Sequence, residues 1–155
     1  MKLTTAVLVA GAAVSLSTAV VGVARLRQDA QHQAERNEAV LARNQIDWLA
    51  QTSTNPDLAK LWKPENVDVE EYMELLSANQ LICMLSLRDR LGAVRDGHLP
   101  FFAWMIMRSD VCRRYWDRFG DLRAQEAEGD ARAEHFTRVL DQAAKSHPQT
   151  QPAAG

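Results

Sequence analysis

The first part of the chain contains a long run without any charged residue. Residues 3–24 are 22 consecutive residues made only of Leu, Val, Ala, Gly, Ser and Thr. As an α-helix this run would extend roughly 33 Å, enough to cross the hydrocarbon core of a bilayer. The alternative is a cleaved signal peptide that begins at Lys2 and ends at the small residues 17–19 or 22–24. The length of the run favours a retained membrane anchor.

The charges that flank this run predict its orientation. Lys2 stands alone on the N-terminal side, whereas Arg25, Arg27 and Arg36 follow on the C-terminal side. Because positive charge collects on the cytoplasmic side of membrane helices, we expect the remainder of the chain to be cytoplasmic. If the run is cleaved instead, the mature protein is secreted.

Four segments are predicted along the 155 residues. Residues 1–26 form the transmembrane anchor or an uncleaved signal, and residues 27–51 form a polar juxtamembrane helical stalk. Residues 52–145 form a helical domain, and residues 146–155, with two prolines, form a disordered tail. No convincing strand pattern occurs, so the expected fold class is all-α, with a compact bundle of about four to five helices.

Helix-capping residues place the helices of this domain. Asn55, followed by proline, predicts the start of a short helix that stops before Pro64. Asp68 predicts the start of a central helix that ends near Gly92. Another helix is expected from about Leu99 after an Asp-Gly turn, and a last one over residues 130–145. The last helix has an apolar stripe formed by Phe136, Val139, Leu140 and Ala143.

Two segments are apolar without any helical period. Residues 81–85 lie in the central helix, and residues 101–107 follow the Asp-Gly turn. Apolar residues on every side of a helix predict burial on several sides, and both segments are too short to span a membrane. Asn79, in the middle of the central helix, is expected to form hydrogen bonds between helices or to face water.

The search for reactive groups predicts no catalytic, cofactor-binding or metal site. The four histidines show no metal-ligand spacing, and no phosphate loop or nucleophile elbow is present. We therefore expect no enzyme activity and no cofactor. The net charge of −2 argues against a nucleic-acid partner. The two cysteines, Cys83 and Cys112, lie in apolar segments and are predicted to be free buried thiols, which suits a reducing compartment. The alternative is a disulfide between them, which two cysteines alone do not establish.

Charge is distributed unevenly along the domain. Residues 57–74 contain six acids and two lysines, whereas residues 88–123 contain eight arginines and five aspartates. These two surfaces can pair within the fold or remain solvated. The alternative is an interaction patch for an acidic protein or anionic lipid headgroups. That patch consists of Arg108, Arg113, Arg114 and Arg118.

Several short motifs resemble those of an uncharacterised actinobacterial family of membrane-anchored helical proteins, a domain of unknown function. They include the apolar run with its polar stalk, residues 55–58 with Trp62, and Asn79 within the long helix. Residues 97–104 and 114–116 complete the resemblance. It implies an anchored helical protein and no assigned activity.

Two functional classes follow. The first is a non-enzymatic, membrane-anchored interaction module at the cytoplasmic face, with the membrane as one partner through residues 3–24 and a protein or a second copy as another. The second is an exported or membrane-associated sensor or enzyme that binds a small apolar ligand. Its pocket would lie among Trp104, Met105, Met107 and the central helix.

Overall fold

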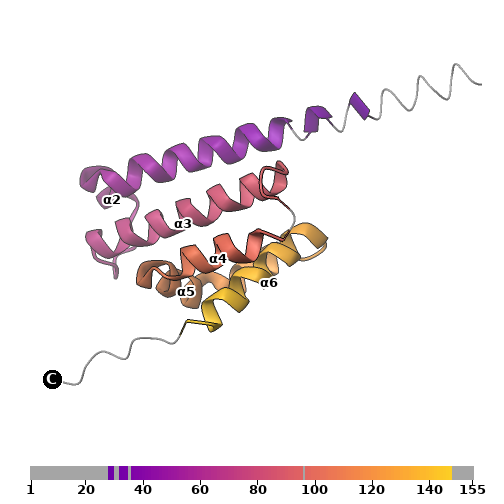
Figure 1. Cartoon of the computed structure of the whole chain (residues 1–155). Coiled ribbons are helices and arrows are strands. Elements are labelled where there is room, and N and C mark those ends of the chain that lie inside the picture. Colours follow the sequence, from indigo (N-terminus) through magenta and orange to yellow (C-terminus); the bar gives the residue numbers. More distant parts are fainter. Residues whose placement is uncertain (1–27, 30–31, 35, 96, 148–155) are drawn as a thin grey trace, which may run out of the picture. The chain divides into compact units, whose positions relative to one another are not determined.

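The computed structural model describes residues 28–29, 32–34, 36–95 and 97–147, which belong to two compact units, Met1–Leu41 and Ala42–Gly155. The described residues form helices and turns, and they contain no strand (Figure 1), which confirms the all-α class. The predicted anchor at residues 3–24 and most of the predicted tail, residues 148–155, lie outside the described residues. Within the described part of the chain, every helix is too short or too polar to cross a membrane.

In the first unit, the described residues 28–29, 32–34 and 36–41 are helical. They belong to the predicted stalk. The second unit begins with helical residues 42–54, before the predicted start of the domain at residue 52. Leu49 and Thr52 of this helix are buried, and the Trp48 ring meets the Trp62 ring edge-on at 6.0 Å between centroids.

Helices α2 (Pro56–Trp62) and α3 (Val69–Arg90) begin where their capping residues predict. The Asn55 side chain accepts hydrogen bonds from two backbone N–H groups of the first turn of α2. The Asp68 side chain accepts one from the first turn of α3. These bonds satisfy N–H groups that have no partner within the helix. Helix α3 ends just before Gly92, whose φ of +68° suits a residue without a side chain.

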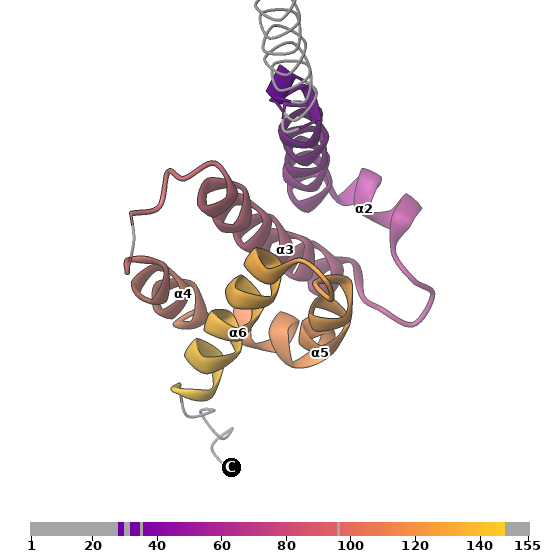
Figure 2. The ribbon, with the colours of Figure 1, turned by 90° about the vertical axis from the view of Figure 1, so that its right-hand side faces the viewer.

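Helices α4 (Leu99–Met107), α5 (Asp110–Glu126) and α6 (Ala131–Lys145) complete the second unit. Helix α6 packs against both α4 and α5, and α5 also packs along α3 (Figure 2). Helix α6 starts where the sequence predicts, directly after Asp130. The Asp130 side chain accepts hydrogen bonds from two backbone N–H groups of the first turn of α6. Helix α5 continues to Glu126, so only a short turn separates it from α6.

The main core of this unit lies among α3, α4, α5 and α6. All four residues of the predicted α6 stripe are buried there, which confirms that prediction. Trp116 of α5 is buried in the same core. Its indole packs directly against Gly120, one turn later on α5, where an added Cβ would lie 3.1 Å from Nε1 of Trp116.

The prediction that the two apolar segments are buried on several sides is wrong in part. In α3, Ile82 and Leu85 are buried, but Leu81 and Met84 are exposed over 47% and 42% of their surface. In α4, one face is buried and the other faces outward. The reason is that neighbouring helices cover only part of the surface of each of these two helices, so the remaining apolar side chains stay exposed.

Candidate functional site

A group of polar side chains lies between α3 and α5. Tyr115 donates a hydrogen bond of 3.0 Å from its hydroxyl to Asn79 Oδ1. Arg123 donates from Nη2 to the same Oδ1 and, at 3.1 Å, to the Tyr115 hydroxyl. Cys83 Sγ lies 3.4 Å from Asn79 Oδ1 and 3.5 Å from Nη2 of Arg123. Asn79 thus forms hydrogen bonds between helices, as one of its two sequence interpretations predicted.

In this polar cluster, most of the groups that contact the Arg123 guanidinium are neutral. Arg123 has a side chain that is only 26% exposed, and its nearest carboxylate, Glu126, is 3.9 Å away and largely exposed. Burial raises the pKa of Tyr115, and the positive charge of Arg123 partly opposes that rise. The cluster therefore joins two helices through a neutral phenol and an amide, and the arrangement favours a structural role.

The four arginines of the predicted patch have different surroundings. Arg114 binds Glu74 of α3 at 2.6 Å, and Arg118 binds Glu71 of α3 at 3.3 Å. Arg113 has a side chain that is 12% exposed, and it binds Asp110 and the backbone carbonyl of Met107. Arg108 is exposed, and its guanidinium lies 5.3 Å from the Trp104 ring centroid. Pairing within the fold thus engages Arg114 and Arg118 with the acidic start of α3.

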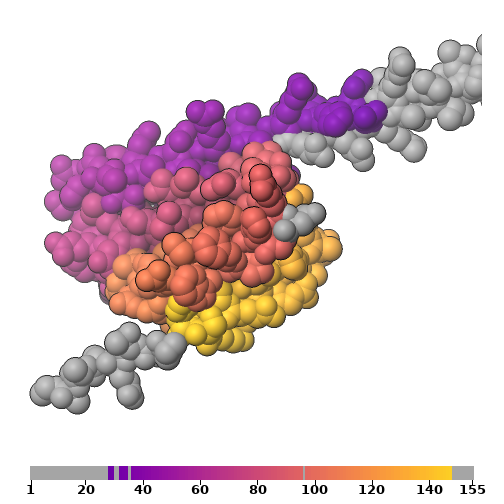
Figure 3. All heavy atoms as spheres, in the orientation of Figure 1, coloured from indigo at the N-terminus to yellow at the C-terminus, as the bar shows by residue number. Residues whose placement is uncertain are grey.

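The outward face of α4 carries large apolar side chains. Phe101, Trp104 and Met105 are exposed over 59%, 40% and 45% of their surface. With Arg108 they follow the spacing i, i+3, i+4 and i+7, so they share one face of the helix. We call these four residues the α4 stripe. Side chains of α4 reach the surface of the second unit in the space-filling view (Figure 3).

The opposite face of the same helix belongs to the core. Leu99, Ala103 and Met107 are buried there. The structure therefore separates the residues of the predicted apolar ligand pocket, because Met107 is in the core and Trp104 and Met105 point outward. Beside the stripe, the ring of His147 lies 5.4 Å from the Trp104 ring.

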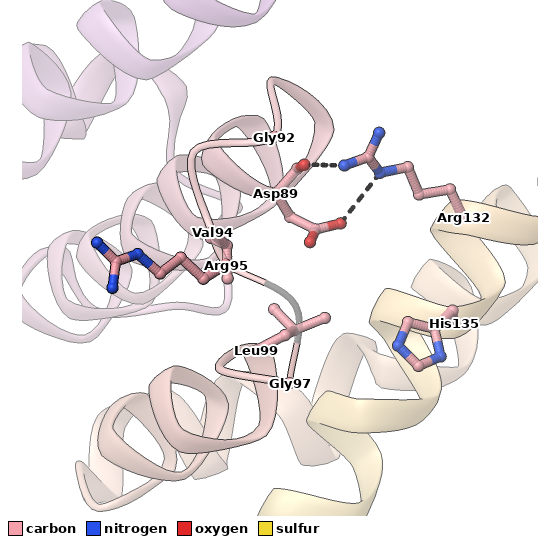
Figure 4. A pocket seen from close by; sticks show the side chains of 8 residues that line it. All are labelled: Asp89, Gly92, Val94, Arg95, Gly97, Leu99, Arg132 and His135. Atoms are coloured by element: carbon pink, nitrogen blue, oxygen red, sulfur yellow. Dashed lines mark hydrogen bonds and ion pairs between the residues drawn. The ribbon is translucent and has the colours of Figure 1, made fainter.

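A pocket of about 570 Å³ opens where the loop after α3 faces α6 (Figure 4). Arg132 crosses its wall and donates hydrogen bonds to the carboxylate and the backbone carbonyl of Asp89. His135 is exposed on the same side of α6, and Arg95 extends away from both (Figure 4). Asp89 and Arg132 pair along this wall, so its surface is polar and suits water better than an apolar ligand. The lining residues are Asp89, Gly92, Val94, Arg95, Gly97, Leu99, Arg132 and His135.

The described residues contain no group of three or more His, Cys, Asp or Glu side chains that could hold a metal ion. Cys112 is buried, and Cys83 is half-buried beside Arg123. Among these residues both thiols are free. Burial raises the pKa of Cys112, although Ser109 and Arg113 act in the opposite direction.

Sequence reasoning found Asn79 and missed its main partner, Arg123. A signal was present, since Tyr115 and Arg123 are eight residues apart and therefore lie on one face of α5. The α4 stripe was missed because a helix that is apolar on every side has no period that separates its buried face from its exposed face.

Comparison with known proteins identifies a family and no individual relative. No curated protein and no solved structure matches the chain. The sequence profile of a family of unknown function, DUF6082, matches residues 2–155, which is almost the whole chain. The chain therefore belongs to the family of unknown function DUF6082.

Proposed function

We propose that this chain is a non-catalytic interaction module, held at a membrane by residues 3–24 with its helical unit in the cytoplasm. The α4 stripe is the surface through which it makes contact. The observation that carries the proposal is the exposure of Phe101, Trp104 and Met105 on one face of α4. Exposed apolar side chains that gather in one place, unlike scattered ones, mark sites of interaction.

The composition of the stripe supports a contact surface. Aromatic residues, methionine and arginine are the types enriched at protein interfaces, and the stripe contains only these. Of the four arginines in the predicted patch, Arg108 lies within the stripe, and its planar guanidinium is close to the Trp104 ring. The other three are engaged by acids within the unit.

Two sequence features support the proposed location. Residues 3–24 are long and apolar enough for an anchor, and more positive charge follows than precedes them. Two free thiols, one of them fully buried, fit a reducing compartment.

The anchor and the orientation are tested together in cells. We expect the full-length chain to resist extraction from membranes at alkaline pH, and its purified form to keep the mass of an uncleaved N-terminus. A C-terminal fluorescent protein should fluoresce, and a C-terminal alkaline phosphatase should stay inactive. An active phosphatase on a chain shortened at residue 19 or 24 would show an exported protein and would refute the cytoplasmic location.

The contact surface is tested by photocrosslinking in the same membranes. A benzophenone amino acid replaces Phe101 in the α4 stripe, and in a control chain it replaces Leu61 of α2, which is even more exposed, at 76%. We expect defined covalent products from position 101 and far fewer from position 61. Equal yields from both positions would show that the stripe is not a contact surface.

A further inference from the structure

The charge carried by the α4 stripe is positive only. The chain from residue 97 to residue 109 contains no acid, whereas Arg108 follows α4. Cations also meet the aromatic rings, because Arg108 lies 5.3 Å from the Trp104 ring centroid and Arg88 of α3 lies 5.5 Å from that of Phe102. The apolar surface is thus bordered by positive charge, which is complementary to an anionic surface.

A second copy of the chain fits this surface poorly. In a twofold dimer the same surface faces itself. Two α4 stripes would then bring two Arg108 side chains into one interface, and the stripe offers no carboxylate to receive them. Like charges without a counter-ion oppose such pairing.

We propose that the α4 stripe lies in the headgroup region of a membrane that contains anionic lipids. Phe101, Trp104 and Met105 would lie at the boundary of the acyl chains, and Arg108 would meet lipid phosphates. Helices that lie in the membrane interface combine an apolar face that contains aromatic residues with basic residues at its edge. The inference rests on the proposed function, because the anchor at residues 3–24 keeps the helical unit close to the bilayer.

The position of α4 in the fold suits a shallow contact with the membrane. Leu99, Ala103 and Met107 on its inner face remain in the core of the unit, so the helix does not need to leave the fold to meet lipid. Tryptophan is favoured at the level of the headgroups because its ring is apolar and its N–H is polar.

The test measures where α4 lies when the full-length protein is reconstituted into vesicles of phosphatidylcholine and phosphatidylglycerol. In a C83S/C112A background, a nitroxide label is placed at Phe101→Cys and, as a control, at Leu61→Cys. We expect the label at 101 to collide more with oxygen than with a nickel complex, because oxygen concentrates in the bilayer. The label at 61 should show the reverse. A label at Met105→Cys repeats the measurement if the first variant does not fold.

The charge variants test the role of Arg108. We expect Arg108→Gln to shift the collisions of the label at 101 toward the nickel complex, since one arginine near an anionic surface changes binding about fivefold. Lys60→Gln, on the exposed part of α2, should leave the collisions unchanged. Nickel-dominated collisions at both 101 and 105 in the unsubstituted background would overturn the proposal, as would identical collisions in both charge variants.

The photocrosslinks from position 101 separate this inference from the function on which it rests. Lipid adducts identified by mass spectrometry support both. If the products contain only protein and the vesicle labels face water, the lipid inference is wrong and the stripe still acts as a contact surface. If neither lipid nor protein products exceed those of the position 61 control, both proposals are wrong.

Discussion

Arg123 is a charged residue whose close partners are neutral. Its guanidinium donates to Asn79, Tyr115 and Cys83 across the α3–α5 contact. A charged group in such a place costs desolvation free energy, which hydrogen bonds must offset. The arrangement therefore depends on every partner being present.

Replacing Arg123 by methionine keeps the length of the side chain and removes all of its donors. We expect the free energy of unfolding to fall by about 1–3 kcal/mol, because Asn79 and Tyr115 lose a partner in a half-buried place. Urea unfolding of the full-length protein in detergent measures the change. Arg43→Met removes an arginine whose side chain is 80% exposed and should change stability by less than about 0.5 kcal/mol. Equal effects of the two substitutions would mean that the cluster adds no stability.

The phenol of Tyr115 gives the fold a dependence on alkaline pH. Burial raises its pKa in the folded protein above the ordinary value, so the folded state holds its proton more tightly than the unfolded state. The resulting stability is complete below the unfolded pKa, about 10, and is lost as pH rises through the folded pKa. Melting temperatures from pH 8 to 11 should therefore fall more steeply for the native protein than for Tyr115→Phe. Parallel curves for the two proteins would contradict this expectation.

At the scale of helices, α3 and α5 are joined by two ion pairs in addition to the polar cluster. Glu71 binds Arg118, and Glu74 binds Arg114, at distances of 3.3 and 2.6 Å. All four side chains are about half exposed, so water and salt weaken their attraction. These pairs align the helices, and their contribution to stability is small.

A double-mutant cycle on Glu74 and Arg114 measures that contribution. We expect a coupling free energy of about 0.2–1 kcal/mol from thermal or urea unfolding of Glu74→Gln, Arg114→Gln and the double variant. The coupling should decrease as salt is added. A coupling well above this range that persists in high salt would mean that the pair is much less solvated than its exposure indicates.

The sequence predicted where several helices begin, but in α3 and α4 it did not predict which faces are buried. Asn55, Asp68 and Asp130 were correctly predicted as helix starts, because capping depends on a few adjacent residues. The outward faces at residues 81–85 and in α4 were not predicted, because apolar side chains surrounded both helices. The faces were set by contacts between helices distant in sequence, which a local pattern does not contain. The same reason explains why Arg123 was not connected to Asn79.

At the scale of the whole molecule, the second unit has one main core to which α3, α4, α5 and α6 all contribute. Leu140 of α6 has no exposed surface in that core. A core shared in this way predicts that these helices unfold together in one transition. The α4 stripe lies outside the core, so it can change without loss of the fold.

Truncation of Leu140 to alanine tests the shared core. We expect the free energy of unfolding to fall by about 2–5 kcal/mol, because the substitution removes apolar contacts and leaves a cavity. Leu122→Ala, at a position that is 52% exposed on α5, serves as the matched control and should cost much less. Chemical denaturation monitored by tryptophan fluorescence and by circular dichroism reports both stability and cooperativity. Two separate transitions in the unsubstituted protein would contradict a single shared core.

Gly120 has a consequence for attempts to stabilise this protein. Glycine inside a helix costs about 1 kcal/mol relative to alanine, so a design procedure that considers α5 alone would replace it. In the folded unit the new methyl group would lie 3.1 Å from Nε1 of Trp116, whose surroundings leave it little freedom to move. We expect Gly120→Ala to gain helix propensity and lose more in packing, with a lower melting temperature as the result. Engineering of this family member should therefore leave position 120 unchanged and begin at exposed positions of α6.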